Sequence, residues 1–71
     1  MYQRCTSIKQ VAYVLSNYDG QIYRDCGTLG GWWIDVDCEE FWGWDRADII
    51  RQANALFKKR GWSAPSNFAL H

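Results

Sequence analysis

Four acidic residues close together are the side chains in this sequence best suited to chemistry. They lie in the segment Asp35-x-Asp37-x-Glu39-Glu40. This spacing begins like a calcium-binding EF-hand loop, which requires glycine at its sixth position and an acid at its twelfth. The sequence has Glu40 and Arg46 at those positions, so we exclude an EF-hand. Two carboxylates on one strand face could share Mg²⁺. No nucleotide-binding loop lies nearby, however, and we expect no metal.

The same acids have an electrostatic interpretation. Side chains on one face of a strand recur about every 6.8 Å, so Asp35, Asp37 and Glu39 would form a line of negative charge that Glu40 continues. Such a line would attract a protein site built to grip a phosphate backbone. The alternative is an ordinary solvated strand face.

Three cysteines and one histidine are the other candidates for metal or nucleophile chemistry. Cys5, Cys26 and Cys38 have no C-x-x-C spacing, and His71 is the final residue. Together they match no recognised zinc pattern. A Cys–His nucleophile pair would also lack a third residue to orient the histidine. We therefore expect buried, reduced, metal-free cysteines, no cofactor and no catalytic residue.

Basic residues and a tryptophan towards the end of the chain suggest a different function. Arg51, Lys58, Lys59, Arg60 and Trp62 could bind nucleic acid through charge and base stacking. The negative end of a helix dipole is a purely local reason for the same charges. Eight basic and eight acidic residues give a formal net charge of zero, which argues against binding nucleic acid through global charge. A nucleic-acid-binding or regulatory module is therefore our alternative function.

A strongly marked helix over residues 45–60 must position many of these groups. Asp45 is suited to cap its first turn, and Gly61 is suited to end it in a left-handed conformation. Its apolar stripe consists of Ile49, Ile50, Ala53, Leu56 and Phe57.

The preceding residues predict one more helix and a hairpin. Residues 8–17 have apolar side chains at helical spacing, and we favour a helix over a strand because strict alternation fails. Residues 21–26 and 32–39 are predicted strands joined by a glycine-rich loop. The second strand alternates, with Trp32, Ile34, Val36 and Cys38 on an apolar face and Trp33, Asp35, Asp37 and Glu39 on an acidic face. A five-residue loop pairs Arg24 with Ile34, and a slip of one pairs Arg24 with Asp35.

These elements predict a single small α+β domain over residues 1–71, in the order α-β-β-α. Both helices are expected on one face of the antiparallel hairpin. Because two strands alone are marginally stable, we expect a third short strand from residues 1–5 or 66–70, or a homodimer that completes the sheet. The chain is thus expected to be a monomer or a homodimer.

Composition indicates an exposed aromatic surface. Aromatic residues make up 17% of the chain and include five Trp, more than one small core is expected to enclose. Tryptophan is enriched at partner surfaces. The chain has no apolar run of the length that a signal peptide or a membrane span needs. We therefore expect a cytoplasmic protein that does not bind membranes.

The function we expect is a non-enzymatic protein–protein interaction with a partner that has a basic surface. By analogy of size and charge pattern, such a chain is typical of phage or mobile-element inhibitors of host nucleic-acid machinery, such as anti-CRISPR or anti-restriction proteins. The predicted partner-binding residues are Trp33, Asp35, Asp37, Glu39, Glu40, Trp42 and Trp44.

Overall fold

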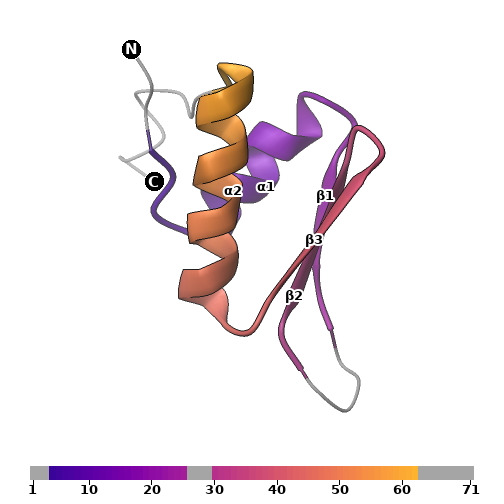
Figure 1. The fold of residues 1–71 in the computed structure, drawn as a ribbon, viewed down its shortest axis with the longest axis vertical. Coiled ribbons are helices and arrows are strands. Elements are labelled where there is room, and N and C mark those ends of the chain that lie inside the picture. The colour runs from indigo at the N-terminus through magenta and orange to yellow at the C-terminus, as the bar shows by residue number, and fades with distance from the viewer. Residues whose placement is uncertain (1–3, 26–29, 63–71) are drawn as a thin grey trace.

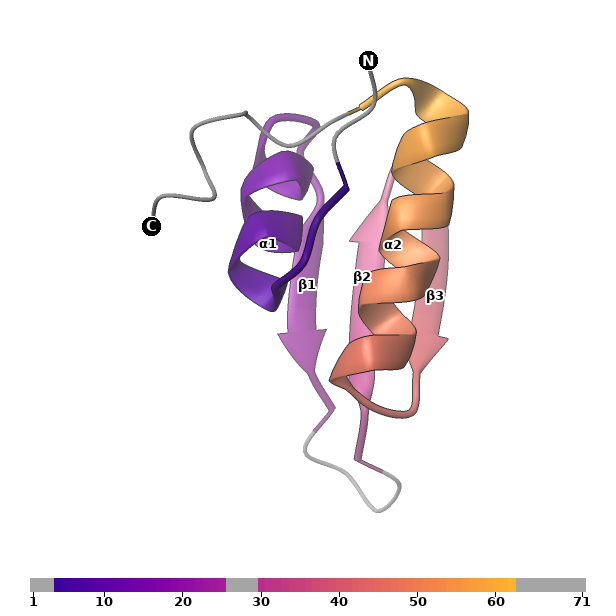
Figure 2. The ribbon, with the colours of Figure 1, turned by 90° about the vertical axis from the view of Figure 1, so that its left-hand side faces the viewer.

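The computed structural model describes residues 4–25 and 30–62, and it confirms the α+β class (Figure 1). The elements are α1 (Ile8–Ser16), β1 (Gln21–Arg24), β2 (Trp32–Val36), β3 (Glu39–Gly43) and α2 (Arg46–Arg60). The three strands form one antiparallel sheet, and both helices lie on the same face of it (Figure 2). Neither helix has the length and apolar character needed to cross a membrane, as judged over the residues described.

The third strand is internal, which corrects the prediction of a strand from a terminus. The predicted strand over residues 32–39 ends at Val36, and the chain then turns back as β3. Asp37 and Cys38 form the turn, with φ of 53° and 63°, the positive values that a two-residue type I′ turn requires. The usual signal is Asn-Gly or Asp-Gly, and neither residue here is glycine. Residues 4–5 are in no strand, and residues 66–70 lie outside the described residues.

The pairing of β1 with β2 differs from both predicted registers. Arg24 pairs with Trp32, and Ile22 pairs with Ile34, because β1 ends two residues earlier than predicted. The Arg24 guanidinium carbon lies 5.9 Å from the centroid of the Trp32 ring, within the range of a cation–π contact. The observed register makes this contact possible, because it places Arg24 directly opposite Trp32.

The predicted signals at both ends of α2 are confirmed. The Asp45 carboxylate accepts a hydrogen bond of 2.8 Å from the Asp48 N–H, as an N-cap residue does. Gly61 has φ of 76°, and the Trp62 N–H donates to the Phe57 carbonyl at 2.8 Å. This Schellman-type ending satisfies a carbonyl of the last turn.

The core lies between the helices and one face of the sheet. The side chain of Asn54 fastens the N-terminal segment to this core, since it accepts from the Cys5 N–H at 2.8 Å and donates to the Cys5 carbonyl at 2.9 Å. The predicted first helix is confirmed as α1, and its Gln10 is buried, where the side-chain oxygen accepts from the Thr6 N–H at 2.6 Å. The buried apolar residues are Cys5, Val11, Val14, Leu15, Ile34, Val36, Ile49, Ala53, Leu56 and Phe57.

Candidate functional site

The sheet has one face covered by helices and one face that no described element covers (Figures 1 and 2). Ile22, Ile34 and Phe41 are cross-strand partners that pack against the core, so they mark the covered face. Successive strand residues point to opposite faces of a sheet. Their sequence neighbours therefore lie on the other side, which we call the open face.

An aromatic row crosses the open face. Tyr23 of β1 pairs with Trp33 of β2, which in turn pairs with Trp42 of β3. The ring of Trp44, just beyond β3, meets the Trp42 ring edge-on, with centroids 4.4 Å apart and an angle of 71° between the planes. Tyr23 is 46% exposed and Trp44 is 66% exposed, while Trp33 and Trp42 are half-buried. We call these four residues the aromatic row.

Two carboxylates lie beside this row, and we call them the acidic pair. Asp35 and Glu40 are direct cross-strand partners on the open face, and both are exposed. Like charges directly opposite each other destabilise a sheet. All eight Lys and Arg residues of the chain lie in the described residues, and none forms an ion pair with either acid. No Lys or Arg of the chain thus offsets the repulsion within the acidic pair through a salt bridge.

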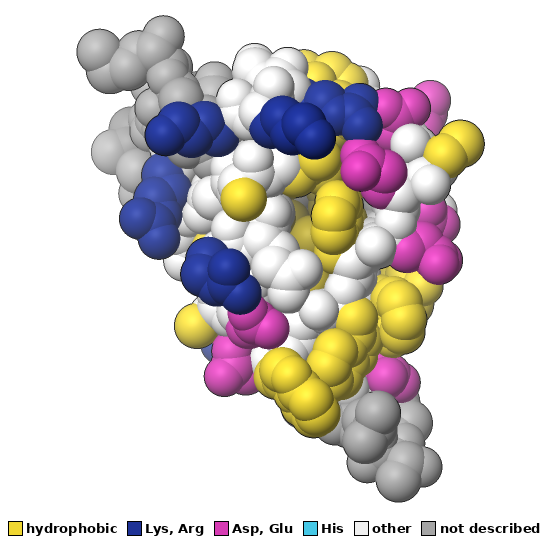
Figure 3. All heavy atoms as spheres, in the orientation of Figure 1, with side chains coloured by type: hydrophobic (Ala, Val, Ile, Leu, Met, Phe, Trp, Pro, Cys, Tyr) yellow, Lys and Arg dark blue, Asp and Glu magenta, His cyan; other side chains and the backbone are white. Residues whose placement is uncertain are grey.

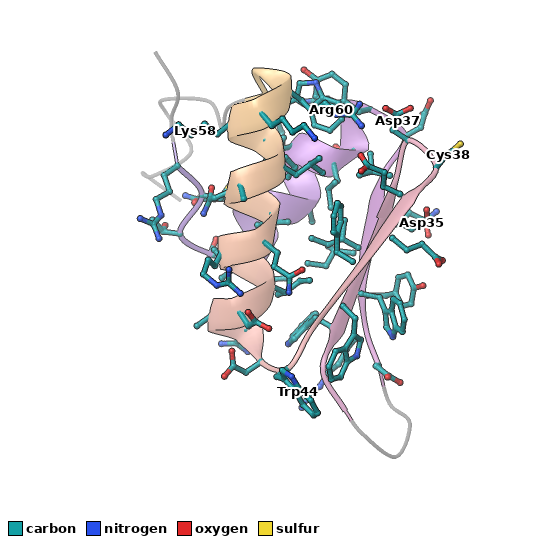
Figure 4. The ribbon with its side chains drawn as sticks, in the orientation of Figure 1. Asp35, Asp37, Cys38, Trp44, Lys58 and Arg60 are labelled. Atoms are coloured by element: carbon teal, nitrogen blue, oxygen red, sulfur yellow. The ribbon has the colours of Figure 1, made fainter. Side chains whose placement is uncertain are left out.

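The predicted line of acids along a single strand face does not form. Asp37 lies in the β2–β3 turn, and Glu39 begins β3 with its side chain towards the helices. Arg60 at the end of α2 bonds to both, through Nη1 to Asp37 and through Nη2 to Glu39 Oε2 at 2.5 Å. The bond to Asp37, followed by that to Glu39, raises the pKa of Arg60 above its ordinary value. Figure 4 shows Arg60 beside Asp37, whereas Asp35 points away from the helices.

Most residues of the alternative, nucleic-acid-binding site make contacts within the chain. Arg51 pairs with Asp48 at 2.5 Å, and Arg60 holds the two acids of the turn region. The Trp62 ring stacks on Tyr18, with centroids 3.8 Å apart and an angle of 9° between the planes. Basic side chains nevertheless gather over α2, opposite the acids of β2 and β3, as Figure 3 shows. The other two residues of the predicted nucleic-acid-binding site, Lys58 and Lys59, are exposed on α2.

Asp48 anchors the start of α2 and the last ring of the aromatic row. Its carboxylate accepts from Arg51 at 2.5 Å and from the Trp44 N–H at 3.1 Å. The bond to Arg51, and then the bond from Trp44, lower the pKa of Asp48 below its ordinary value. This carboxylate therefore fixes the backbone from which the Trp44 side chain projects.

The cysteines differ in environment, which corrects the prediction that all are buried. Cys5 is a buried free thiol, and burial raises its pKa to about 11. Cys38 is a free thiol but is exposed in the turn, rather than on the apolar strand face. Cys26 and His71 lie outside the described residues. Within residues 4–25 and 30–62, no three His, Cys, Asp or Glu side chains gather as a metal site.

Comparison with protein-family models, with curated proteins and with solved structures finds no match for this chain. The geometry of the open face is therefore the basis on which a function can be inferred. That face unites Trp33, Asp35, Glu40, Trp42 and Trp44 of the predicted set, and it leaves out Asp37 and Glu39.

Tyr23 is the aromatic residue of the open face that is absent from the predicted partner-binding set. Its strand is only four residues long, and nothing local shows that its ring aligns with Trp33. The alternation within Gln21–Arg24 was the available signal. It becomes informative only when the register with β2 is known.

Proposed function

We propose that this chain is a non-enzymatic protein-interaction module that binds a partner with a basic surface through its open face. One observation carries the proposal: two like-charged residues, Asp35 and Glu40, oppose each other beside exposed aromatic rings. Their repulsion is unfavourable in the free protein. A lysine or arginine of a partner would relieve it, so the same pair would favour the complex.

The aromatic row supports the same function. Tryptophan and tyrosine are enriched among the residues that dominate binding energy at protein interfaces. Interfaces commonly place such rings in an apolar centre and polar groups at the rim. On the open face Trp33 and Trp42 would form the centre, and the acidic pair would form part of the rim.

The class of partner follows from the charge. Protein sites that hold a phosphate backbone carry lysine and arginine. A surface that combines carboxylates with flat rings could occupy such a site and exclude the nucleic acid. We therefore propose, as the specific form of this function, an inhibitor of a nucleic-acid-binding protein or complex.

The test is capture of partners from a nuclease-treated lysate, followed by surface plasmon resonance with the purified partner at two salt concentrations. The test variant is Asp35→Asn with Glu40→Gln, which keeps shape and removes the acidic pair. The matched control is Asp37→Asn with Glu39→Gln, which removes the same charge from acids that already bond to Arg60. Trp33→Ala tests the aromatic row.

We expect the test variant to slow association, most strongly at low salt, because charge complementarity acts mainly on the on-rate. The control should associate almost as fast as the wild type. Trp33→Ala should speed dissociation, since losing an anchor acts mainly on the off-rate. Equal association rates for test variant and control would show that only net charge matters, and the open-face proposal would be wrong.

The alternative function, direct nucleic-acid binding, is favoured by the two exposed lysines at the end of α2. It is tested by retention of the protein on heparin or duplex DNA at low salt. Retention that Lys58→Ala with Lys59→Ala abolishes would support this alternative. Passage without retention would favour the protein-interaction module.

A further inference from the structure

A hollow of about 270 Å³ lies between β3 and α2, on the helix side of the sheet. Figure 3 looks onto this region, where hydrophobic atoms lie between the helix and the sheet, with basic side chains along α2. The hollow is separate from the open face because it lies on the other side of β3. Its lining residues are Glu39, Phe41, Arg51, Gln52, Ala55, Leu56 and Lys59.

The strand beside this hollow is a free edge of the sheet. The strand order is β1-β2-β3, so among the described strands β3 has a partner on one side only. A two-residue turn places Val36 and Glu39 in a hydrogen-bonded pair, and such pairs alternate along an antiparallel ladder. Glu40 and Trp42 therefore direct their backbone N–H and C=O groups away from β2.

One of these outward groups already bonds to α2. The Gln52 side-chain amide donates to the Trp42 carbonyl at 2.9 Å, as expected if that carbonyl faces the free edge. Within residues 4–25 and 30–62, no backbone carbonyl accepts a hydrogen bond from the N–H groups of Glu40 and Trp42. Exposed backbone groups of this kind are the template on which another strand can pair.

We propose that the edge of β3 binds an extended peptide segment of another protein as a fourth strand. In this mode of recognition, main-chain hydrogen bonds supply affinity, and pockets for alternate side chains supply specificity. The N–H groups of Glu40 and Trp42 donate to the peptide, and one apolar side chain of the peptide enters the hollow. This interaction goes beyond the proposed function, because it uses the edge and the helix side of β3 rather than the open face.

The chemistry of the hollow defines the peptide. Its apolar lining, Phe41, Ala55 and Leu56, suits an aliphatic or aromatic side chain. Lys59 stands at its rim and forms no ion pair within the described residues, whereas Arg51 and Glu39 are both paired. Same-face residues of the peptide recur every second position. The preferred segment therefore has an apolar residue with Asp or Glu two positions away, against Lys59.

The experiment is selection of a displayed library of random eight-residue peptides on the immobilised full chain, followed by titration of enriched synthetic peptides into the ¹⁵N-labelled protein. Enriched peptides should share the apolar residue and the acid two positions away. Their binding should shift the amide resonances of Glu40 and Trp42 most strongly. Enrichment without that spacing, or shifts centred on Tyr23 and Trp33 that leave the amides of Glu40 and Trp42 unchanged, would overturn the proposal.

Two variants with matched controls locate the contact. Glu40→Pro removes the outward N–H at an edge position, where proline is tolerated, and should weaken peptide binding by about tenfold, the upper range for one hydrogen bond. Glu40→Gln keeps that N–H and controls for the lost charge. Ala55→Phe, at an exposed helix position, should fill the hollow and abolish binding even if Glu40→Pro disturbs the fold. Trp33→Ala should leave peptide binding unchanged.

A second copy of this chain is the competing partner for the edge of β3. Sedimentation of the free protein distinguishes the two, because pairing between two copies through β3 gives a dimer that Glu40→Pro dissociates. Such a dimer would overturn the peptide proposal. A monomer that binds the enriched peptides, and that loses them with Ala55→Phe, would establish it. Failure of the open-face experiments would leave this result unaffected, since they remove side-chain carboxylates and rings of the open face, whereas peptide binding here depends on backbone N–H groups of β3 and on the hollow beside α2.

Discussion

The two faces of the sheet come from the same three strands, yet they are built for different tasks. On the covered face, Ile22, Ile34 and Phe41 pack towards the helices and contribute to the core. One residue along each strand, Tyr23, Trp33 and Trp42 lie on a face that no described element covers. Packing restricts the first set to apolar side chains of suitable shape. The second set is free of that restriction, so its rings and charges are available for recognition.

The four clustered acids repeat this contrast within six residues of sequence. Asp37 and Glu39 bond to Arg60 and join the β2–β3 turn to α2. Asp35 and Glu40 face each other, and neither forms an ion pair with a residue that the structure describes. The first two therefore contribute to the fold, and the last two are the better candidates for binding. The same carboxylate chemistry thus has two roles, and the position of each side chain, in the turn, towards the helices or on the open face, decides between them.

The largest expected loss of stability comes from a comparison of two adjacent residues, Ile34 and Trp33, that lie on opposite faces of the sheet. Ile34 is fully buried, so Ile34→Ala should lower the free energy of unfolding by about 2–5 kcal/mol. Trp33→Ala removes more atoms, but from a half-buried position, and should lower it by clearly less. Urea denaturation of both variants makes the comparison. Equal losses would mean that the open face contributes to folding as much as the covered face does.

A polar contact on the covered side should have the next largest effect. Asn54→Ala leaves both backbone groups of Cys5 without their partner, and each unsatisfied buried group costs about 1–3 kcal/mol. We therefore expect a loss of at least about 1 kcal/mol in the free energy of unfolding, measured by thermal or chemical denaturation. Lys58→Ala, at an exposed position on the same helix, is the control. A similar loss in both variants would contradict this role of Asn54.

Reversing one charge of the acidic pair should increase stability while weakening binding. Glu40→Lys replaces a repulsive cross-strand pair with an attractive one, and such pairs contribute about 0.2–1 kcal/mol. Chemical denaturation should therefore show a modest gain in the free energy of unfolding. Surface plasmon resonance should show slower association with a basic partner. If binding is unchanged in the more stable variant, the acidic pair has no part in recognition.

The smallest expected effect concerns an acid that has partners. The pKa of Asp48 is lowered from its ordinary value of 3.8, so its ionised form stabilises the folded state above that value. This contribution is lost as the pH falls through the lowered pKa. Asp48→Asn should therefore lower the Tm slightly at pH 7, and the difference from wild type should shrink below about pH 4. A difference that stays constant between pH 7 and pH 2.5 would contradict this account.

The sequence by itself determined the position of α2 and the opposite faces occupied by Trp33 and Ile34 in β2. The N-cap at Asp45, the ending at Gly61 and the apolar stripe between them are local signals, because each acts within one or two helical turns. The alternation of Trp33 with Ile34 likewise follows from the geometry of a single strand. These features require no knowledge of distant residues.

Only the tertiary structure decided where β2 ends, how β1 is registered and which acids are paired. The turn at Asp37 and Cys38 has no glycine, and the Arg60 that bonds to Asp37 lies 23 residues away in sequence. The alignment of Tyr23 with Trp33 depends on pairing between two strands, not on either strand alone. These features arise from contacts between distant segments, and for that reason the open face became a defined surface only in the folded chain.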